Sequence, residues 1–423
     1  MHAAVWIVAL AAVVTAASAL SRRVPLPPPL SLTVLGLAAS FVPGVPPVRL
    51  TPDVVLVGFL PPLLYATALR TSLVDVRRNK LAIVQLSVGL VIVTTLVTAL
   101  MIWWLLPVPF AVAVAVGAVV APPDAVAATA VARRVGMPRR MVTVLEGAAL
   151  LNDATALVGL RTAIAATSTT LSVWGVGLSF LLTAAGGLAV GLAVAVVTGR
   201  VRRVITDEIT DTAVSLVTPF LAYLVAEELH VSGVLAVVAA GLILSHKAYL
   251  LQSASSRIFE RTSWRTVEFL LENAVFFFIG LQARQIVADA SESRLPVGRV
   301  ILVCVAVPLT VMALRPLWVF PMVYPPVLVS RIRRSSPTVD PLPWSVPAGI
   351  SWAGMRGVVT VAAAFVLPTD TPYRSVLVLI AIVVVGSTLL LQGATLPLLL
   401  TRLGLRGPDA AAEALQLAPC RRR

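Results

Sequence analysis

An asparagine and an aspartate, Asn152 and Asp153, stand side by side near the middle of the apolar segment 141–168. An ionised carboxylate at the centre of a bilayer costs several kcal/mol, so a carboxylate kept there suggests a functional site. Counted along a helix, Asp153 lies roughly 18 Å from the start of its segment, close to the midplane of a hydrocarbon core about 30 Å thick. A second acid, Asp124, is about as deep in the preceding segment 110–134. Two acids at one depth predict an ion or proton site.

Residues that break helices lie at the same depth as these acids. The pair Pro122-Pro123 directly precedes the second acid, and the run Gly354–Gly357 lies inside the apolar segment 345–367. Prolines remove helical hydrogen bonds, and freed carbonyls at membrane depth need protein or water as partners. Broken helices in corresponding parts of two inverted repeats mark the midplane site of secondary transporters. An alternative interpretation is that Gly and Pro are simply common in membrane helices, and that Arg356 only bonds to carbonyls. The depth that these residues share with the acids favours a site, in which Arg356 compensates the charge of opposed helix ends.

The composition places these residues in a membrane protein. Of the 423 residues, 58% are hydrophobic and 12% are charged, and the mean hydropathy is +0.96. We predict an all-α polytopic fold of about 13 transmembrane helices, with inverted repeats and two crossing discontinuous helices. The transmembrane domain is expected over residues 1–405, and a short basic cytoplasmic tail over 406–423. The predicted spans are 3–20, 30–46, 52–70, 81–106, 109–134, 141–168, 173–199, 209–227, 231–246, 266–283, 297–325, 345–367 and 374–401.

Positive charges are distributed unevenly between the loops. With the N-terminus outside, alternate loops hold 25 of the 33 Lys and Arg residues, and the opposite loops hold five. This bias predicts that the basic loops and the C-terminus are cytoplasmic. The longest connections, 247–265 and 330–344, are then basic cytoplasmic loops. The net charge of +14 is explained by topology and by attraction to anionic lipid in the bilayer, so no nucleic-acid partner is expected.

The first apolar run ends in Ala-Ser-Ala at residues 17–19, which resembles a signal-peptidase site. A cleaved signal has a positive region before its apolar run, and only His2 stands there. We therefore expect the run to be kept as a span of a multi-pass plasma-membrane protein. No cofactor is expected, because the histidines are isolated from one another and from the cysteines, so that their spacing assembles no zinc-type cluster.

Four motifs occur in order along the chain and together carry a family resemblance. They read FLPPLL at 59–64, APPDAVAATAVARRVGMPRR at 121–140, LEGAALLNDATALV at 145–158 and WAGMRGVV at 352–359. Over roughly residues 5–400 the chain resembles the bacterial branch of the monovalent cation/proton antiporters, the bacterial sodium–proton exchangers. The resemblance implies a secondary active antiporter, not an enzyme, that exchanges protons for Na⁺ or K⁺ and serves intracellular pH and cation homeostasis.

The resemblance also implies a role for each residue of the predicted site. Asp153 would carry cation and proton in turn, and Asn152 would be its partner in the Asn-Asp pair typical of electroneutral members. Asp124 and Pro123 would lie where the broken helices cross, with Asp153 and Asp124 contacting the Na⁺ or K⁺ ion. Related exchangers are usually dimers, so a homodimer is expected.

Three departures from the family pattern concern the site. The family usually has an acid where this chain has Ala66. It usually has a glutamate and then a serine where this chain has Ala148 and Ala149. One of the lost acids is thought to pair with a membrane arginine. Fewer ligand oxygens replace the hydration shell of an ion less well, so we expect weak cation binding and poor discrimination between Na⁺ and K⁺.

An arginine that has lost its acid would leave an uncompensated buried charge, which is costly enough to demand another partner. Arg315 is the expected orphan. Its candidate substitute partners are Glu146, Glu268 and Glu272.

The remaining charged residues of the spans allow more than one interpretation. Glu146 could line a cytoplasmic funnel or merely extend to the interface. Glu268 and Glu272 are expected to serve in structural ion pairs with basic side chains. Arg161 is expected to extend its charged head to the interface near the outer end of its span.

Three classes of function fit some of these features. A cation/proton antiporter accounts for the midplane acids, the broken helices and the motif order. A permease for another small solute, or a transporter converted into a sensor, would account for the lost acids. An intramembrane enzyme has little support, because no His/Glu metal motif and no Gly-x-Ser-x-Gly turn appears. Proton flux tied to added Na⁺ or K⁺ would separate the first class from the others.

Overall fold

A computed structural model describes residues 15, 28–42, 51–52, 54–74, 80–124, 139–168, 173–293, 295–323 and 343–405. Among these residues every regular element is a helix, and eight helices are long and apolar enough to cross a bilayer. The prediction of an all-α polytopic membrane protein is therefore confirmed. Each predicted span from 30–46 onward contains a described helix, whereas the span 3–20 (except residue 15) and the tail 406–423 lie outside the described residues.

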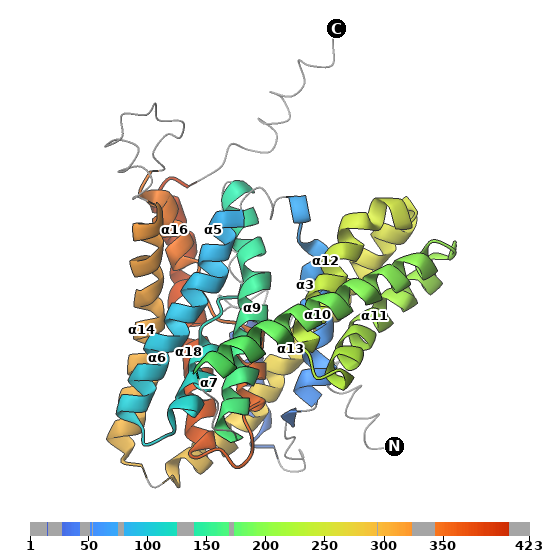
Figure 1. The fold of residues 1–423 in the computed structure, drawn as a ribbon. Helices are drawn as coiled ribbons and strands as arrows, with labels where there is room; N and C mark the ends of the chain where they lie inside the picture. The colour runs from blue at the N-terminus through green and yellow to red at the C-terminus, as the bar shows by residue number, and fades with distance from the viewer. Residues whose placement is uncertain are drawn as a thin grey trace.

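The helices form two packed groups (Figure 1). The first, here called the crossing bundle, consists of α5 (Lys80–Val84), η2 (Gln85–Gly89), α6 (Leu90–Leu105), α7 (Phe110–Val120), α9 (Arg139–Ser168), α14 (Val297–Val323), α16 (Ser345–Trp352), α17 (Val358–Phe365) and α18 (Arg374–Arg402). The second, the flanking bundle, consists of α2 (Pro28–Ala39), η1 (Val54–Phe59), α3 (Leu60–Arg70), α10 (Val173–Arg202), α11 (Glu208–Glu228), α12 (Gly233–Leu251) and α13 (Ala254–Ser291). Both η1 and η2 are π-helical turns joined to α-helices, a feature frequent at functional sites.

Small residues allow the helices of the flanking bundle to approach closely. A Cβ added at Gly280 would lie 2.1 Å from the carbonyl oxygen of Thr33, and one at Gly36 would lie 2.2 Å from that of Phe277. Backbone contact of this kind replaces the hydrophobic drive that helices lack in lipid. It fixes α2 against α13.

The two predicted helix breaks are confirmed. Helix α7 ends at Val120, and residues 121–124, which contain the proline pair, are not helical. The twelfth span is divided into α16 and α17 by the non-helical residues 353–357. Residues 125–134, the other part of the fifth predicted span, lie outside the described residues.

The prediction of a long basic loop at 247–265 was wrong. Helix α12 continues to Leu251, and α13 starts at Ala254, where the side chain of Ser253 accepts a hydrogen bond from the Ser256 amide at 3.0 Å. The polar residues of this extension are paired inside the protein, since Arg202 Nη2 lies 3.0 Å from Glu260 Oε1. Because the polar side chains of this extension have buried partners, its sequence lacks the apolar pattern from which helical spans were predicted. The second expected loop, 330–344, is described only at its last two residues.

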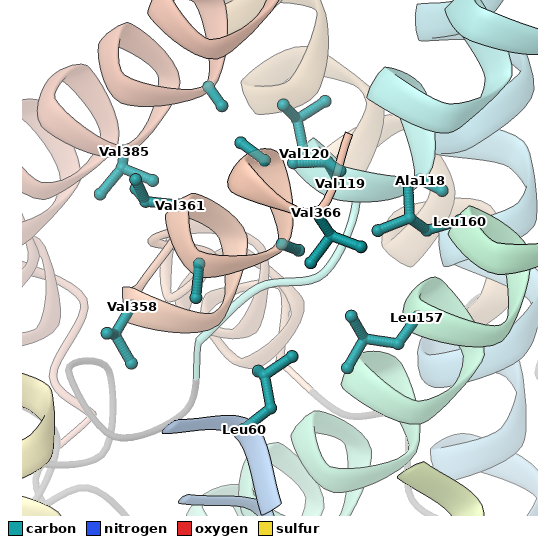
Figure 2. Close-up of a cluster of buried hydrophobic side chains, with 14 of the residues drawn as sticks. Leu60, Ala118, Val119, Val120, Leu157, Leu160, Val358, Val361, Val366 and Val385 are labelled. Carbon is teal, nitrogen blue, oxygen red and sulfur yellow. The ribbon is translucent and has the colours of Figure 1, made fainter. Parts of the chain in front are cut away.

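A continuous apolar core surrounds the point where the broken helices meet. Figure 2 shows Val119 and Val120 of α7, Leu157 and Leu160 of α9, and Val358 and Val361 of α17 around this point. At the contact of α7, α9 and α17, side chains such as Leu157 and Leu160 leave no room for a water molecule. Around Ala156, Leu157 and Leu160, the part of α9 that follows Asp153 is therefore packed without water.

Candidate ion site

Arg356 bonds to the carbonyl end of α7. Its Nε donates to the carbonyl of Val120 at 3.1 Å, its Nη2 donates to that of Ala121 at 3.0 Å, and its Nη1 donates to the carbonyl of Gly354. Helix ends leave such carbonyls unpaired and carry partial negative charge. The guanidinium, only 2% exposed, therefore meets both the hydrogen-bond need and the charge of the broken helix. Arg356 thus lies between the two broken segments.

Asp124 lies on the other side of the same crossing. Its amide donates to the carbonyl of Met355 at 2.7 Å, which ties the two broken segments together. A Cβ added at Gly357 would lie 1.8 Å from Asp124 Oδ2, so only glycine fits there. Because Gly357 caps the start of α17, the Asp124 carboxylate lies beside the positive end of that helix.

A narrow cavity connects Asp124 with the asparagine of the Asn-Asp pair. Pro123, Asp124 and Asn152 all line it, together with side chains of η2, α9 and α14. The volume of this cavity that a water molecule can occupy is about 10 Å³, close to the minimum for one water molecule. Asn152 is 1% exposed, and its Oδ1 has no hydrogen-bond partner among the described residues. A buried amide oxygen without a donor is suited to contact a cation.

Asp153, the next residue on α9, is partly buried and lies within electrostatic reach of Asp124. It makes no hydrogen bond or ion pair with any residue that the structure describes. Four of the predicted site residues, Asp153, Asn152, Asp124 and Pro123, are thus gathered at the crossing. Glu146 is partly buried and does not line the cavity, so both interpretations of it stay open.

Arg315 of α14 lines the same cavity, opposite Ala148 and Ala149 of α9. It is 4% exposed, and its Nε and Nη1 have no hydrogen-bond partner within the described ranges. The candidate substitute Glu268 pairs with Arg70 instead. The lost acid is therefore not replaced by Glu268, and the arginine faces the alanines that stand in the family's polar positions.

Arg161, which was expected to extend to the interface, also has partners on a neighbouring helix. Its guanidinium donates to Glu227 and to the hydroxyl of Tyr223, both on α11, and lies over the Tyr223 ring at 5.6 Å from the centroid. The sequence places these partners more than sixty positions apart, so no local pattern reveals them. The contact joins the Asp153 helix to the flanking bundle.

Sequence reasoning also missed Thr388 of α18. Its Oγ1 accepts a hydrogen bond from the Arg356 amide at 3.1 Å and donates to the carbonyl of Val384 at 2.8 Å. Thr388 is fully buried. Its only signal in the sequence was the polar pair Ser387-Thr388 in the middle of a long apolar span.

Two broken helices that cross beside partly buried carboxylates, in a fold whose described elements are all helices, are typical of a secondary transporter. Within the described ranges no group of three or more His, Cys, Asp and Glu side chains could hold a metal ion. The model of the transmembrane sodium/hydrogen exchanger family matches residues 8–402. The chain belongs to this family, whose members are transporters and not enzymes.

Characterised and uncharacterised bacterial relatives support the assignment. An uncharacterised Na⁺/H⁺ exchanger of Mycobacterium tuberculosis is 33% identical over 428 residues, which cover 99% of this chain and 78% of the relative. A sodium, potassium, lithium and rubidium/H⁺ antiporter of Bacillus pumilus is 33% identical over 413 residues, which cover 93% of this chain and 60% of that longer protein.

A solved structure shares the fold. The sodium proton antiporter MjNhaP1 from Methanocaldococcus jannaschii superposes with a TM-score of 0.74, covering 95% of this chain and 99% of that one. Its sequence identity is 16%, so the likeness concerns the fold alone.

Proposed function

We propose that the protein exchanges protons for Na⁺ or K⁺ across the plasma membrane, by competition of the two ions for Asp153. The observation that carries this proposal is the meeting of Asp153, Asp124 and the unpartnered Asn152 oxygen at the helix crossing. Carboxylate and amide oxygens are the ligands that hard cations prefer. Arg356 compensates the charge of the α7 end and leaves these oxygens available to the ion.

Exchange follows from the cost of burying a charge. An empty, ionised carboxylate is expensive in a low dielectric, and either a proton or a cation neutralises it. The loaded forms are then cheap to move, while the empty form is penalised, so ions are exchanged instead of leaking. The crossing bundle would shift against the flanking bundle around this site. One cation for one proton would make the cycle electroneutral.

We propose that the site is reached from one side only in this state, as alternating access requires. The cavity is lined by the residues of α9 that precede Asp153, on the Arg139 side. The residues that follow it pack into the dry contact around Leu157 and Leu160. The open state is therefore proposed to face the side of the Arg139 end.

We propose that the Arg139 side is cytoplasmic, as the loop charges favour. The experiment uses a background with Cys304→Ser and Cys420→Ser, and single cysteines at two exposed positions, Asp289→Cys and Arg203→Cys. An impermeant thiol reagent added to intact cells should label the first and not the second. The reverse pattern would contradict the orientation.

The choice of ion is proposed to be broad. The Bacillus relative is named for sodium, potassium, lithium and rubidium, and the alanines at 148 and 149 bring no oxygen to the cavity. A site with few fixed ligands distinguishes ions poorly. We expect Na⁺ and K⁺ to be transported with similar, high apparent KM values.

The test is cation-driven proton movement in proteoliposomes that hold the purified protein and a pH-sensitive dye. Addition of Na⁺, K⁺ or Li⁺ should dissipate an imposed pH gradient, whereas choline should not. The rate should stay the same when the membrane potential is clamped at different values, because an electroneutral cycle moves no net charge. Absence of cation-dependent proton flux would favour the permease or sensor alternative, and a rate that changes with potential would contradict electroneutrality.

A further inference from the structure

Helix α13 carries three glutamates whose environments differ. Glu260 lies 3.0 Å from Arg202 Nη2 and accepts a hydrogen bond from Gln252 at 2.9 Å. Glu268 pairs with Arg70 at the end of α3. Glu272, one helical turn further on, makes no hydrogen bond or ion pair with the residues that the structure describes. The expected ion pair is therefore present for Glu268, and the described residues give Glu272 none.

Glu272 lies between the Arg70–Glu268 pair and the helix crossing. It is partly buried and within electrostatic reach of Asp124, Glu268 and Arg70. Helix α13 packs against α3 on one side and against α17 and α18 on the other. Four residues of helix span about 6 Å, so Glu272 is one step deeper than the Arg70–Glu268 pair on the way to Asp124.

The position is on the accessible half of the protein. The carbonyl of Leu69, next to Arg70, accepts a hydrogen bond from Ser245 at 2.7 Å, so the ends of α3 and α12 lie together at this face. Lys80 starts α5 a short distance along the chain, and α5 and η2 pack against the first half of α9. The glutamate is thus on the same side of Asp153 as the cavity at Asp124 and Asn152.

An unpaired carboxylate at membrane depth is costly, and natural membrane proteins keep one chiefly for transport. We propose that Glu272 is a transient binding site for the exchanged ions on the route between the Arg70 face and Asp124. It binds a cation from water and releases it inward, or takes a proton and returns it outward, and ends each cycle as the same carboxylate. Its negative charge also raises the local cation concentration on the route. This inference rests on the proposed exchange function.

The experiment measures apparent KM for Na⁺ from each face, in everted and right-side-out vesicles, for Glu272→Gln, Glu272→Asp and the parent. Loss of one charge in a partly wet site should raise KM at the Arg70 face about fivefold to tenfold. KM at the opposite face should stay within about twofold. The Asp variant, which keeps the charge, should recover most of the loss. The matched control is Glu292→Gln, which removes an exposed glutamate at the other end of α13.

The outcomes separate this inference from the proposed function. Exchange by the parent with an unchanged KM in Glu272→Gln would show that the glutamate is no ion site, with the exchange function intact. An equal loss from both faces, with a lower melting temperature in detergent and no recovery by Asp, would show a structural role and also overturn the inference. No exchange by the parent would overturn both.

Discussion

Replacing Asp153 by asparagine is expected to abolish cation-driven proton movement while leaving a folded protein. The side chain keeps its size but can no longer release a proton or neutralise a cation, so exchange should fall at least about a hundredfold. Folding should survive, because Asp153 has no partner among the described residues that the change would orphan. Removing a buried charge should leave the melting temperature in detergent unchanged or raise it. Vesicle fluorescence and a thermal melt measure the two effects.

Two further variants make this result specific. Asp289→Asn removes an exposed aspartate at the far end of α13 and should exchange like the parent. Asp153→Glu keeps a carboxyl group in a displaced position and should retain a measurable part of the rate. Parent-like exchange by Asp153→Asn would refute competition at this residue.

The breaks in the two crossing helices were predictable because their causes are local. Pro122 and Pro123 lack amide donors wherever they stand, and the glycines at 354 and 357 weaken a helix irrespective of its neighbours. The depth of Asp124 and Asp153 follows from counting residues along apolar runs. The two breaks are present in the structure, whereas the depth of the acids stays a prediction.

The pairings could not be predicted, because their partners are distant in the chain. Arg161 meets Glu227 and Tyr223 on α11, and Arg70 meets Glu268 on α13, through the packing of the two bundles. The same holds for the polar start of α13, which is helical because Glu260 and Trp264 find buried partners on α10 and α11. A pattern based on hydropathy treats such a segment as a loop.

The environment of Arg315 could be predicted from an acid that the sequence lacks at Ala148. The alanine at 148 was expected to leave an arginine without its acid, and the structure brings Ala148 and Arg315 to one cavity. Two guanidinium nitrogens lack partners among the described residues. The sequence analysis had to choose between arginines on different spans, and the cavity shared by Ala148 and Arg315 agrees with the choice of Arg315.

Introducing Ala148→Glu is therefore expected to stabilise the protein and to tighten cation binding. A carboxylate at this position would pair with Arg315, whose buried Nε and Nη1 have no hydrogen-bond partner among the described residues. Completing a buried pair is expected to add about 2 kcal/mol to the free energy of unfolding relative to a neutral side chain of the same size. Neutralising the arginine also removes its repulsion of a cation near Asp124, so apparent KM for Na⁺ should fall several-fold.

Size and charge must be separated, because Ala148 packs in a small cluster with Leu86, Leu90, Val144 and Val319, where a longer side chain can cost about 1–3 kcal/mol. Ala148→Gln has the size of Glu without its charge, so the difference between the two variants measures the pair alone. Repeating both in an Arg315→Met background completes a double-mutant cycle. The advantage of Glu over Gln, in melting temperature and in KM, should vanish there. If Glu is no better than Gln beside Arg315, or keeps its advantage without the arginine, another partner compensates this charge and the account of the cavity is wrong.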